Sequence, residues 1–282
     1  YAGNEGEEKA QKTYNYDFAG TTVKTTTTFN YTADALTSSV TVKGQDGTVK
    51  QSETFYTGNE GEEIADYSHN FKLGTTTIKT TSFYFYNGLR ADNAAVTTED
   101  AMNMSESYKG ELLVVDPAKL RSRTYYVGEK GDEIADYSHN MKLGAATETI
   151  KTTSFYLYKD TYLAATDASV TAEDAMTKSE TYDGTLTTPD ATKIISETFY
   201  KGDKGYEIAD YSWNHKKGTA TIKTTSFYFY NGNRADTADS EQAMTSSETY
   251  KGSLTATDVT KIMSRTYYVG EKGDEIADYS HN

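Results

Sequence analysis

The chain of 282 residues contains no cysteine, two prolines and few large aliphatic side chains. Without cysteine it has no disulfides and no thiolate metal sites. Because proline is scarce, the commonest breaker of β-strands is nearly missing. Leu, Ile, Val and Phe together number 42, about 15% of the chain, and the net charge is −14; this combination is typical of disordered chains. Apolar runs are only a few residues long, so no segment has the length to span a bilayer.

Tyrosine offsets this shortage of aliphatic side chains. There are 25 tyrosines at regular intervals, with a large excess of threonine, and both residue types favour β-strands. The acidic balance, with a pI near 4.8, argues against nucleic acid as a partner, because phosphates require stripes of Lys and Arg. It also argues against binding to an anionic membrane surface. We therefore expect a folded, β-rich chain with thin hydrophobic burial, no nucleic-acid partner and no membrane insertion.

The sequence is repetitive. The 19-residue block SRTYYVGEKGDEIADYSHN begins at Ser122 and again, unchanged, at Ser264. A shorter block, KTTSFY, returns at intervals of 72 residues. Related blocks alternate, so that SETFY matches its next copy after 144 residues and SRTYY matches its copy after 142. Such self-similarity indicates a repeat of about 70 residues that was duplicated as a pair.

The block EIADYS marks successive repeats. It divides the chain into a divergent first repeat at 1–55, repeats at 56–125, 126–199 and 200–267, and the start of a further repeat at 268–282. Both ends fall inside a repeat, which favours a fragment of a longer array.

Each repeat is predicted to contain about four strands joined by Gly-rich turns. Regular alternation within EIADYSHN puts Ile134, Asp136 and Ser138 on one face. The segment Thr171–Met176 is predicted to form a short helical turn. The expected fold is therefore all-β, with tandem repeats of mainly antiparallel strands stacked into an elongated array or fibre. The alternative is a β-solenoid.

One segment, TYNYDFAG, contains Tyr14, Tyr16, Asp17 and Gly20 in a Y-x-Y-D-x-x-G pattern. It resembles the YD/RHS-type repeats of bacterial surface and secreted proteins. Later repeats keep the Tyr-x-Tyr pattern but lose Asp-x-x-Gly. The wider pattern of Cys-free, Tyr- and Thr-rich repeats is similar to repeat regions of giant bacterial cell-surface proteins. The resemblance implies an extended extracellular β-array and no particular ligand.

Two sets of repeated residues are candidates for packing between repeats or for binding. Tyrosines recur within the strands and could pack against a neighbour or contact a ligand: Tyr67, Tyr84, Tyr86, Tyr137, Tyr156, Tyr158, Tyr211, Tyr228, Tyr230 and Tyr279. Carboxylates recur in Gly-rich turns, and such oxygens suit Ca²⁺: Glu62, Glu63, Asp132, Glu133, Asp203 and Glu207. These turns lack the spacing of a dedicated calcium loop, and lysines sit within several of them, so we expect solvated hairpin tips and no cofactor.

No residue set predicts a reaction. Asp136 and its counterparts recur in every repeat, whereas a glycosidase needs one facing pair of acids. We therefore expect a structural component of an extracellular bacterial fibre, stalk or surface layer, built by repeat stacking and self-association. The alternative is an adhesin-like array whose repeated Tyr faces bind glycan or another surface. We do not expect an enzyme.

Overall fold

The computed structural model describes residues 1–3, 8–17, 20–144, 147–273 and 275–282. Within them the secondary structure is β-strand, with one 3₁₀ turn, η1 (Pro117–Lys119), and no α-helix. The all-β prediction is confirmed. The strands are β1 (Lys12–Tyr16), β2 (Val23–Thr32), β3 (Ala35–Lys43), β4 (Lys50–Thr57), β5 (Ile64–Phe71), β6 (Ile78–Tyr86), β7 (Leu89–Arg90), β8 (Met102–Lys109), β9 (Leu120–Val127), β10 (Ile134–Met141), β11 (Ile150–Tyr158), β12 (Leu163–Ala164), β13 (Met176–Asp183), β14 (Ile194–Lys201), β15 (Ile208–His215), β16 (Ile222–Tyr230), β17 (Met244–Lys251), β18 (Ile262–Val269) and β19 (Ile276–His281).

The segment Thr171–Met176 was predicted to form a short helical turn; the structure has a single hydrogen-bonded turn there and no helix. The Asp174 carboxylate accepts hydrogen bonds from the backbone N–H of Thr171 at 2.7 Å and from its hydroxyl at 3.0 Å. These bonds have the capping-box arrangement, and the Asp174 N–H donates to the Thr171 carbonyl at 3.1 Å, but they close a single turn that no helix continues. The chain then enters β13 at Met176.

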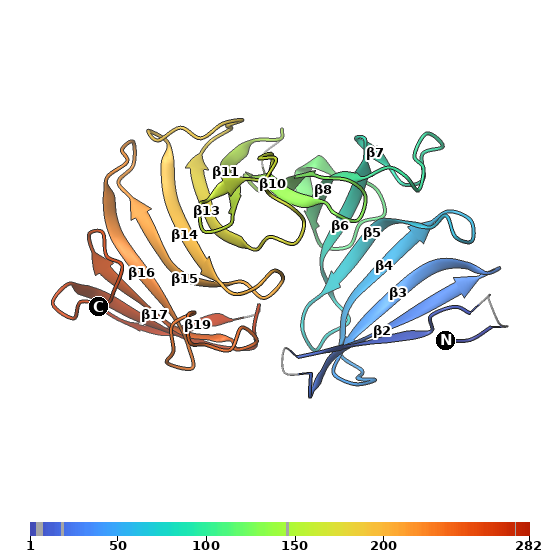
Figure 1. Cartoon of the computed structure of the whole chain (residues 1–282), viewed down its shortest axis with the longest axis horizontal. Coiled ribbons are helices and arrows are strands. Elements are labelled where there is room, and N and C mark those ends of the chain that lie inside the picture. Colours follow the sequence, from blue (N-terminus) through green and yellow to red (C-terminus); the bar gives the residue numbers. More distant parts are fainter. Residues whose placement is uncertain (4–7, 18–19, 145–146, 274) are drawn as a thin grey trace. The chain divides into compact units, whose positions relative to one another are not determined.

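The chain divides into two compact units, one made of Tyr1–Glu133 and Met141–Thr149 and the other of Ile134–Asn140 and Ile150–Asn282. In the first, β1, β2, β3, β4, β5, β6, β8 and β9 pair in that order, and β7 pairs with the end of β6. In the second, β11 and β13 to β19 pair in order, with β12 on β11. Figure 1 shows strands following one another in chain order within each unit.

Every described pairing is antiparallel, so the antiparallel meander is confirmed and the β-solenoid alternative is wrong. A parallel solenoid would need strands that run in the same direction. Among the described pairings, none closes the order of strands into a ring, and the sheet is therefore open.

Each described pairing between long strands contains a bulge, where two residues oppose one. Between β4 and β5, Phe55 faces Tyr67 and Tyr56 faces Ala65, so Asp66 is the extra residue. A bulge bends its strand and increases the local twist, which explains why the sheets curl in Figure 1. Asp66 consequently lies on the face of Tyr67, opposite Ser68, and the regular alternation expected for this motif fails.

The two faces of each sheet differ in chemistry. The aromatic face, defined by Tyr67, Phe83 and Tyr108 and their counterparts, holds ring stacks and most of the buried core. Loops between strands fold back over it, such as 87–101 and 110–119 in the first unit. The hydroxyl face, defined by Ser68 and Tyr84 and their counterparts, holds rows of hydroxyl groups.

Candidate functional site

The hydroxyl face contains six of the tyrosines expected to pack or to bind. Three bond to a serine on the neighbouring strand with hydroxyl oxygens about 3 Å apart: Tyr84 to Ser68 at 2.9 Å, Tyr156 to Ser138 at 2.9 Å and Tyr228 to Ser212 at 2.8 Å. Three others donate their hydroxyl to an alanine carbonyl: Tyr86 to Ala65, Tyr158 to Ala135 and Tyr230 to Ala209, at 2.9, 2.7 and 2.9 Å. All six hydroxyls therefore join neighbouring strands of the same unit.

Burial controls the ionisation of these tyrosines. It raises the pKa of Tyr86 to about 12 and raises the pKa of Tyr84 and Tyr228 as well. A phenol that keeps its proton continues to donate its hydrogen bond. The hydroxyl rows are therefore neutral throughout the physiological pH range.

The four remaining candidate tyrosines lie on the aromatic face. Tyr67 stacks on Phe55 with 4.5 Å between ring centroids, and Tyr211 stacks on Phe199 at the same distance. Tyr137 packs against Phe155 at 5.8 Å, and Tyr279, which is half exposed, stacks on Tyr267 at 4.6 Å. Ring pairs at these separations contribute about 0.5–1.5 kcal/mol beyond their buried area.

A buried ion pair caps the aromatic face in the first unit. Arg90 donates from Nε to Asp66 Oδ1 at 2.6 Å and from Nη2 to Oδ2 at 2.5 Å, and its guanidinium carbon lies 4.1 Å from the centroid of Phe83. The turn Asn87–Gly88 brings the arginine there, because both residues adopt the positive φ that a tight hairpin requires. In the second unit Arg234 repeats the arrangement, with Asp210 and Phe227.

The copy at 126–199 lacks this arginine. In the first unit Arg90 pairs with Phe85, whereas the corresponding pair here is Ala164 with Leu157. Asp136 corresponds to Asp66 in the sequence. Burial raises the pKa of Asp136 above its ordinary value. The aspartate therefore carries a desolvation cost that no arginine offsets.

Replacing Asp136 with asparagine is expected to stabilise the second unit at neutral pH. A raised folded-state pKa means that the ionised carboxylate opposes folding, and the penalty disappears as the pH falls through that pKa. Urea unfolding monitored at pH 7 and at pH 4 measures the effect. The gain should be present at pH 7 and shrink at pH 4, and a loss of stability at pH 7 would contradict the explanation.

A buried threonine fixes the loop that covers each aromatic stack. Thr81 is fully buried; its hydroxyl donates to the Gly110 carbonyl at 2.9 Å and accepts from the Leu112 N–H at 3.0 Å. Thr153 and Thr225 make the same pair of bonds in the second unit. The second threonine of each KTT block is thus a structural residue rather than an exposed strand former.

The histidine of the EIADYSHN block contacts the same loop. His69 Nε2 lies 3.4 Å from the Leu112 carbonyl oxygen, and His139 Nε2 lies 3.4 Å from that of Leu186. Where the sequence has Trp213 instead, its indole N–H donates to the Leu254 carbonyl at 3.0 Å. A ring N–H thus reaches the same carbonyl in either case, which explains why tryptophan can replace histidine here.

The acidic turns place one glutamate per copy against backbone N–H groups. Glu133 accepts from Met102 at 3.0 Å and from Gly131 at 2.9 Å, and Glu63 and Glu207 make matching pairs of bonds. Glu62 accepts a long bond, 3.4 Å, from Asn59, whereas Asp132 and Asp203 are exposed turn residues. Within the described residues, no group of three or more His, Asp or Glu could hold a metal ion.

Removing divalent cations is expected to leave the melting temperature unchanged, because both oxygens of Glu63, Glu133 and Glu207 already bond to backbone N–H groups. Thermal unfolding with EDTA and with added Ca²⁺ tests this. A rise in melting temperature that saturates with Ca²⁺ would show that the turns bind the ion.

The copy at 126–199 also contains a charge network that sequence reasoning missed. Elsewhere a glutamate pairs with an arginine on the next strand, as Arg123 Nε does with Glu106 at 2.6 Å. Here Lys178 donates to Glu180 at 2.7 Å and to Glu197 at 2.6 Å. Burial acts to lower the pKa of Lys178, but these two bonds outweigh it and raise the pKa. The only sequence signal was a lysine in KSETY where the related blocks have Met or Ser.

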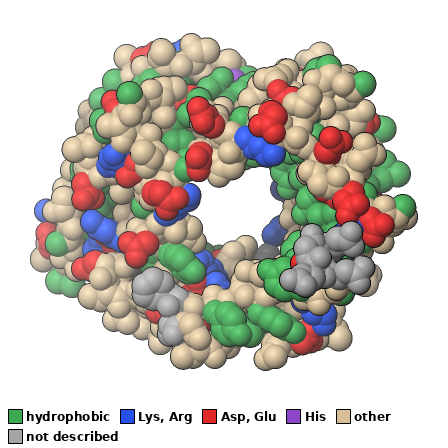
Figure 2. Space-filling model, turned by 45° about the vertical axis from the view of Figure 1, so that its right-hand side comes forward, with side chains coloured by type: hydrophobic (Ala, Val, Ile, Leu, Met, Phe, Trp, Pro, Cys, Tyr) green, Lys and Arg blue, Asp and Glu red, His purple; other side chains and the backbone are tan. Residues whose placement is uncertain are grey.

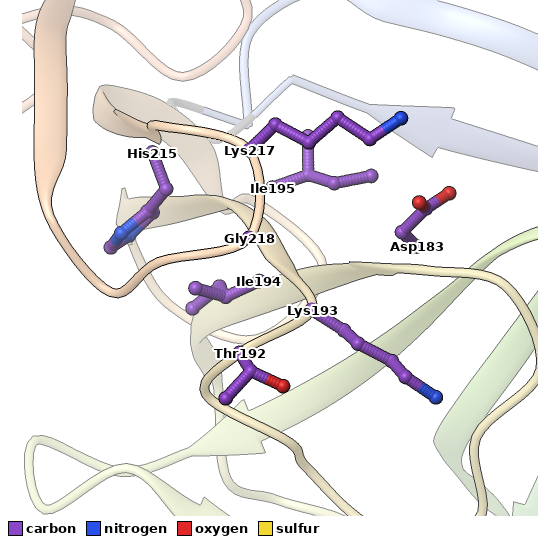
Figure 3. A pocket seen from close by; sticks show the side chains of 8 residues that line it. All are labelled: Asp183, Thr192, Lys193, Ile194, Ile195, His215, Lys217 and Gly218. Atoms are coloured by element: carbon purple, nitrogen blue, oxygen red, sulfur yellow. The ribbon is translucent and has the colours of Figure 1, made fainter.

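Glu197 also lies 3.3 Å from Nε2 of His215, which borders a pocket of about 350 Å³ in the second unit. Figure 3 shows the eight lining residues: Asp183, Thr192, Lys193, Ile194, Ile195, His215, Lys217 and Gly218. They come from the ends of β13 and β15, the start of β14, and the turns beside them. The residues expected to bind a ligand do not lie here.

Comparison with known proteins gives no relative. No family model matches the chain, and no curated protein matches it. Among the described residues, no helix is long and apolar enough to cross a membrane. Acidic side chains are spread over the face drawn in Figure 2 and form no single cluster there.

Proposed function

We propose that this chain is a structural component of an extracellular fibre, stalk or surface layer. The observation that carries the proposal is that the repeated residues bond to other parts of the same chain. Four kinds of contact recur at matching positions: tyrosine hydroxyls bonded to serines, buried threonines bonded to loop backbone, turn glutamates bonded to backbone N–H groups, and arginine–aspartate ion pairs. Each connects a strand to its neighbour or to the loop that covers it. Residues repeated for internal bonding suit a protein whose task is to hold its shape.

We further propose a repeat of four long strands. The strand that begins in each EIADYS block and the three long strands after it would form one repeat: β5, β6, β8 and β9, then β10, β11, β13 and β14, then β15 to β18. β1 to β4 would be the divergent first copy and β19 would begin the next. Stacked repeats of this kind derive stability from nearest-neighbour contacts, which permits long arrays with little apolar surface per repeat.

Electron microscopy of the protein isolated from its source tests the structural function. The proposal expects continuous filaments or a regular layer whose axial spacing corresponds to one or two repeats. Discrete compact particles, with no tendency to associate, would overturn it. Extracellular location is tested on the same material by labelling intact cells with an antibody against the chain.

Attachment to glycan through repeated tyrosine faces is the second candidate, and it has weaker support. The hydroxyls of Tyr84, Tyr156 and Tyr228 are engaged by serines, and those of Tyr86, Tyr158 and Tyr230 by backbone carbonyls. A stacking platform needs an exposed ring face, whereas all six rings are buried or half-buried. Retention on glycan surfaces that falls when Tyr84 or Tyr228 is changed to alanine would favour this function.

A further inference from the structure

The two ends of the strands in the second unit differ in the charge of their connecting segments. Antiparallel pairing places the start of β11 and three connections at one end: 183–194, 215–223 and 251–262. Four connections share the opposite end: 158–176, 201–208, 230–244 and 269–276. Each charged residue of a connection is therefore assigned to one end by the topology alone.

The first of these ends, which we call the lysine end, is basic. Its exposed, described lysines and carboxylates are seven lysines and one aspartate: Lys151, Lys193, Lys216, Lys217, Lys223, Lys251, Lys261 and Asp183. Figure 3 shows Lys193, Lys217 and Asp183 around one pocket of this end. The whole chain has a net charge of −14, so its composition does not explain a basic surface.

The opposite end, which we call the acidic end, reverses this balance. Its exposed, described charged side chains are seven carboxylates and three lysines: Asp160, Asp167, Glu173, Asp203, Asp236, Asp239, Glu271, Lys201, Lys204 and Lys272. The first unit is sorted in the same sense. There Lys72, Lys79, Lys109 and Lys119 are exposed at one end of the strands, and Glu60, Glu62, Asp92 and Glu99 are exposed at the other.

This sorting of charge does not serve contacts inside a unit. A strand of eight residues such as β14 is about 26 Å long, at about 3.3 Å per residue. That length exceeds the Debye length of about 8 Å at physiological ionic strength, so the two ends of one unit do not neutralise each other. The buried ion pairs of the sheet use other residues, such as Arg234 with Asp210 and Lys178 with Glu197. Charges sorted in this way suit contact with another molecule.

We propose that the lysine end docks on the acidic end of a second copy of this chain, so that copies associate along the direction of their strands. Charge complementarity identifies this partner, because a row of carboxylates that matches the lysines is built on the same strands. At both ends a charged connection recurs with every second strand, which is about 10 Å for strands about 4.8 Å apart. The two rows therefore have the same period and meet along the whole sheet.

The strength of this contact comes from the number of ion pairs. One exposed ion pair contributes little, but rows of equal period form several pairs at once, and a longer array forms more of them. The inference rests on the proposed structural function and specifies its geometry. Repeats extend the assembly across the strands, docked ends extend it along them, and the two directions together produce a layer.

Two complementary variants of the full chain test the proposal. The lysine-end variant carries four substitutions: Lys193→Gln, Lys217→Gln, Lys223→Gln and Lys251→Gln. The acidic-end variant carries another four: Asp160→Asn, Glu173→Gln, Asp203→Asn and Asp236→Asn. All eight side chains are exposed, and a melting temperature equal to that of the parent chain verifies that each variant folds. Sedimentation velocity over a concentration series at physiological ionic strength measures association of the parent chain, of each variant and of their equimolar mixture.

The expected result is association of the parent chain that weakens about tenfold or more in each variant and recovers in the mixture, where an intact lysine end meets an intact acidic end. The acidic-end variant is the stricter test. It is four charges less negative than the parent chain, so general repulsion between copies predicts that it associates more tightly. Docking through the ends predicts that it associates more weakly.

A parent chain that stays monomeric through the whole series, an acidic-end variant that associates as tightly as the parent, or a mixture no better than either variant would overturn the proposal. An anionic polysaccharide that binds the lysine end while the copies stay apart would overturn the second copy as the partner. If these results come with filaments or layers in the protein isolated from its source, only the docked ends are wrong. Absence of any assembly in that material would overturn the structural function as well.

Discussion

Replacing Arg90 with alanine is expected to destabilise the sheet around β5 and β6 by about 3–5 kcal/mol, the usual cost of breaking a buried ion pair from one side. Asp66 would lose two hydrogen bonds of 2.5–2.6 Å while its side chain remains only 13% exposed. Phe83, which is fully buried, would lose the guanidinium that lies over its ring. Amide hydrogen exchange in β5 and β6 measures the loss of protection directly, without assuming that a two-unit chain unfolds in one step.

Two further variants distinguish the effect of breaking the ion pair from the effect of removing any arginine. Arg121→Ala removes an exposed arginine next to β9's first residue and should change protection by less than about 0.5 kcal/mol. Adding Asp66→Asn to Arg90→Ala should recover part of the loss, because it removes the uncompensated charge. If Arg90→Ala leaves β5 and β6 as protected as in the parent chain, the ion pair is not what holds loop 87–101 on the aromatic face.

The second large effect expected is unfolding in alkali. Burial raises the pKa of Tyr86 and Tyr211 to about 12 from an ordinary 10.0, and it also raises the pKa of Tyr84, Tyr108, Tyr182, Tyr200, Tyr228, Tyr230 and Tyr250. The unfolded chain loses these protons near pH 10, whereas the folded chain keeps them until higher pH. Stability is therefore fully present below pH 10 and falls by about 1.4 kcal/mol per pH unit for each such tyrosine above it.

Because several buried tyrosines contribute together, the chain should unfold cooperatively between pH 10 and 12. Ultraviolet absorbance of tyrosinate and far-ultraviolet circular dichroism, followed in one titration, should change together. If most tyrosines ionise near pH 10 while the circular dichroism is unchanged, the hydroxyl rows are open to solvent and do not hold the strands together.

The strands and their antiparallel order could be predicted from the sequence, because the repeated Tyr- and Thr-rich blocks are separated by short Gly-rich turns. The bulges could not. At Asp66 the register slips by one residue, yet nothing in EIADYS distinguishes it from a strand with regular alternation. This one slip transfers the aspartate to the aromatic face, where Arg90 meets it. The aspartate of this motif was predicted to lie on the same face as the serine. That prediction was wrong because the bulge shifts the register, and the residue types give no sign of the bulge.

The pairing of loops with strands could not be predicted either. Arg90 is 24 residues from Asp66, and Leu112 is 31 residues from Thr81. In the sequence these loops appear as polar connections, because only a few of their atoms touch the core. The pocket at His215 gave no signal in the sequence. The block at Ile208 reads WNH where the block at Ile134 reads HNM, a change of residue types that does not by itself indicate a cavity.

Lengthening the chain by one pair of repeats tests most directly whether repeated internal bonds build this protein. A second copy of residues 122–263 inserted after residue 263 adds 142 residues, and both junctions keep the native local sequence because Ser122 and Ser264 begin the same block. If each repeat is stabilised by its neighbours, thermal unfolding monitored by circular dichroism should show one folded population. Its melting temperature should equal or exceed that of the parent chain. A lower melting temperature, or an inserted segment that limited proteolysis removes, would contradict the account.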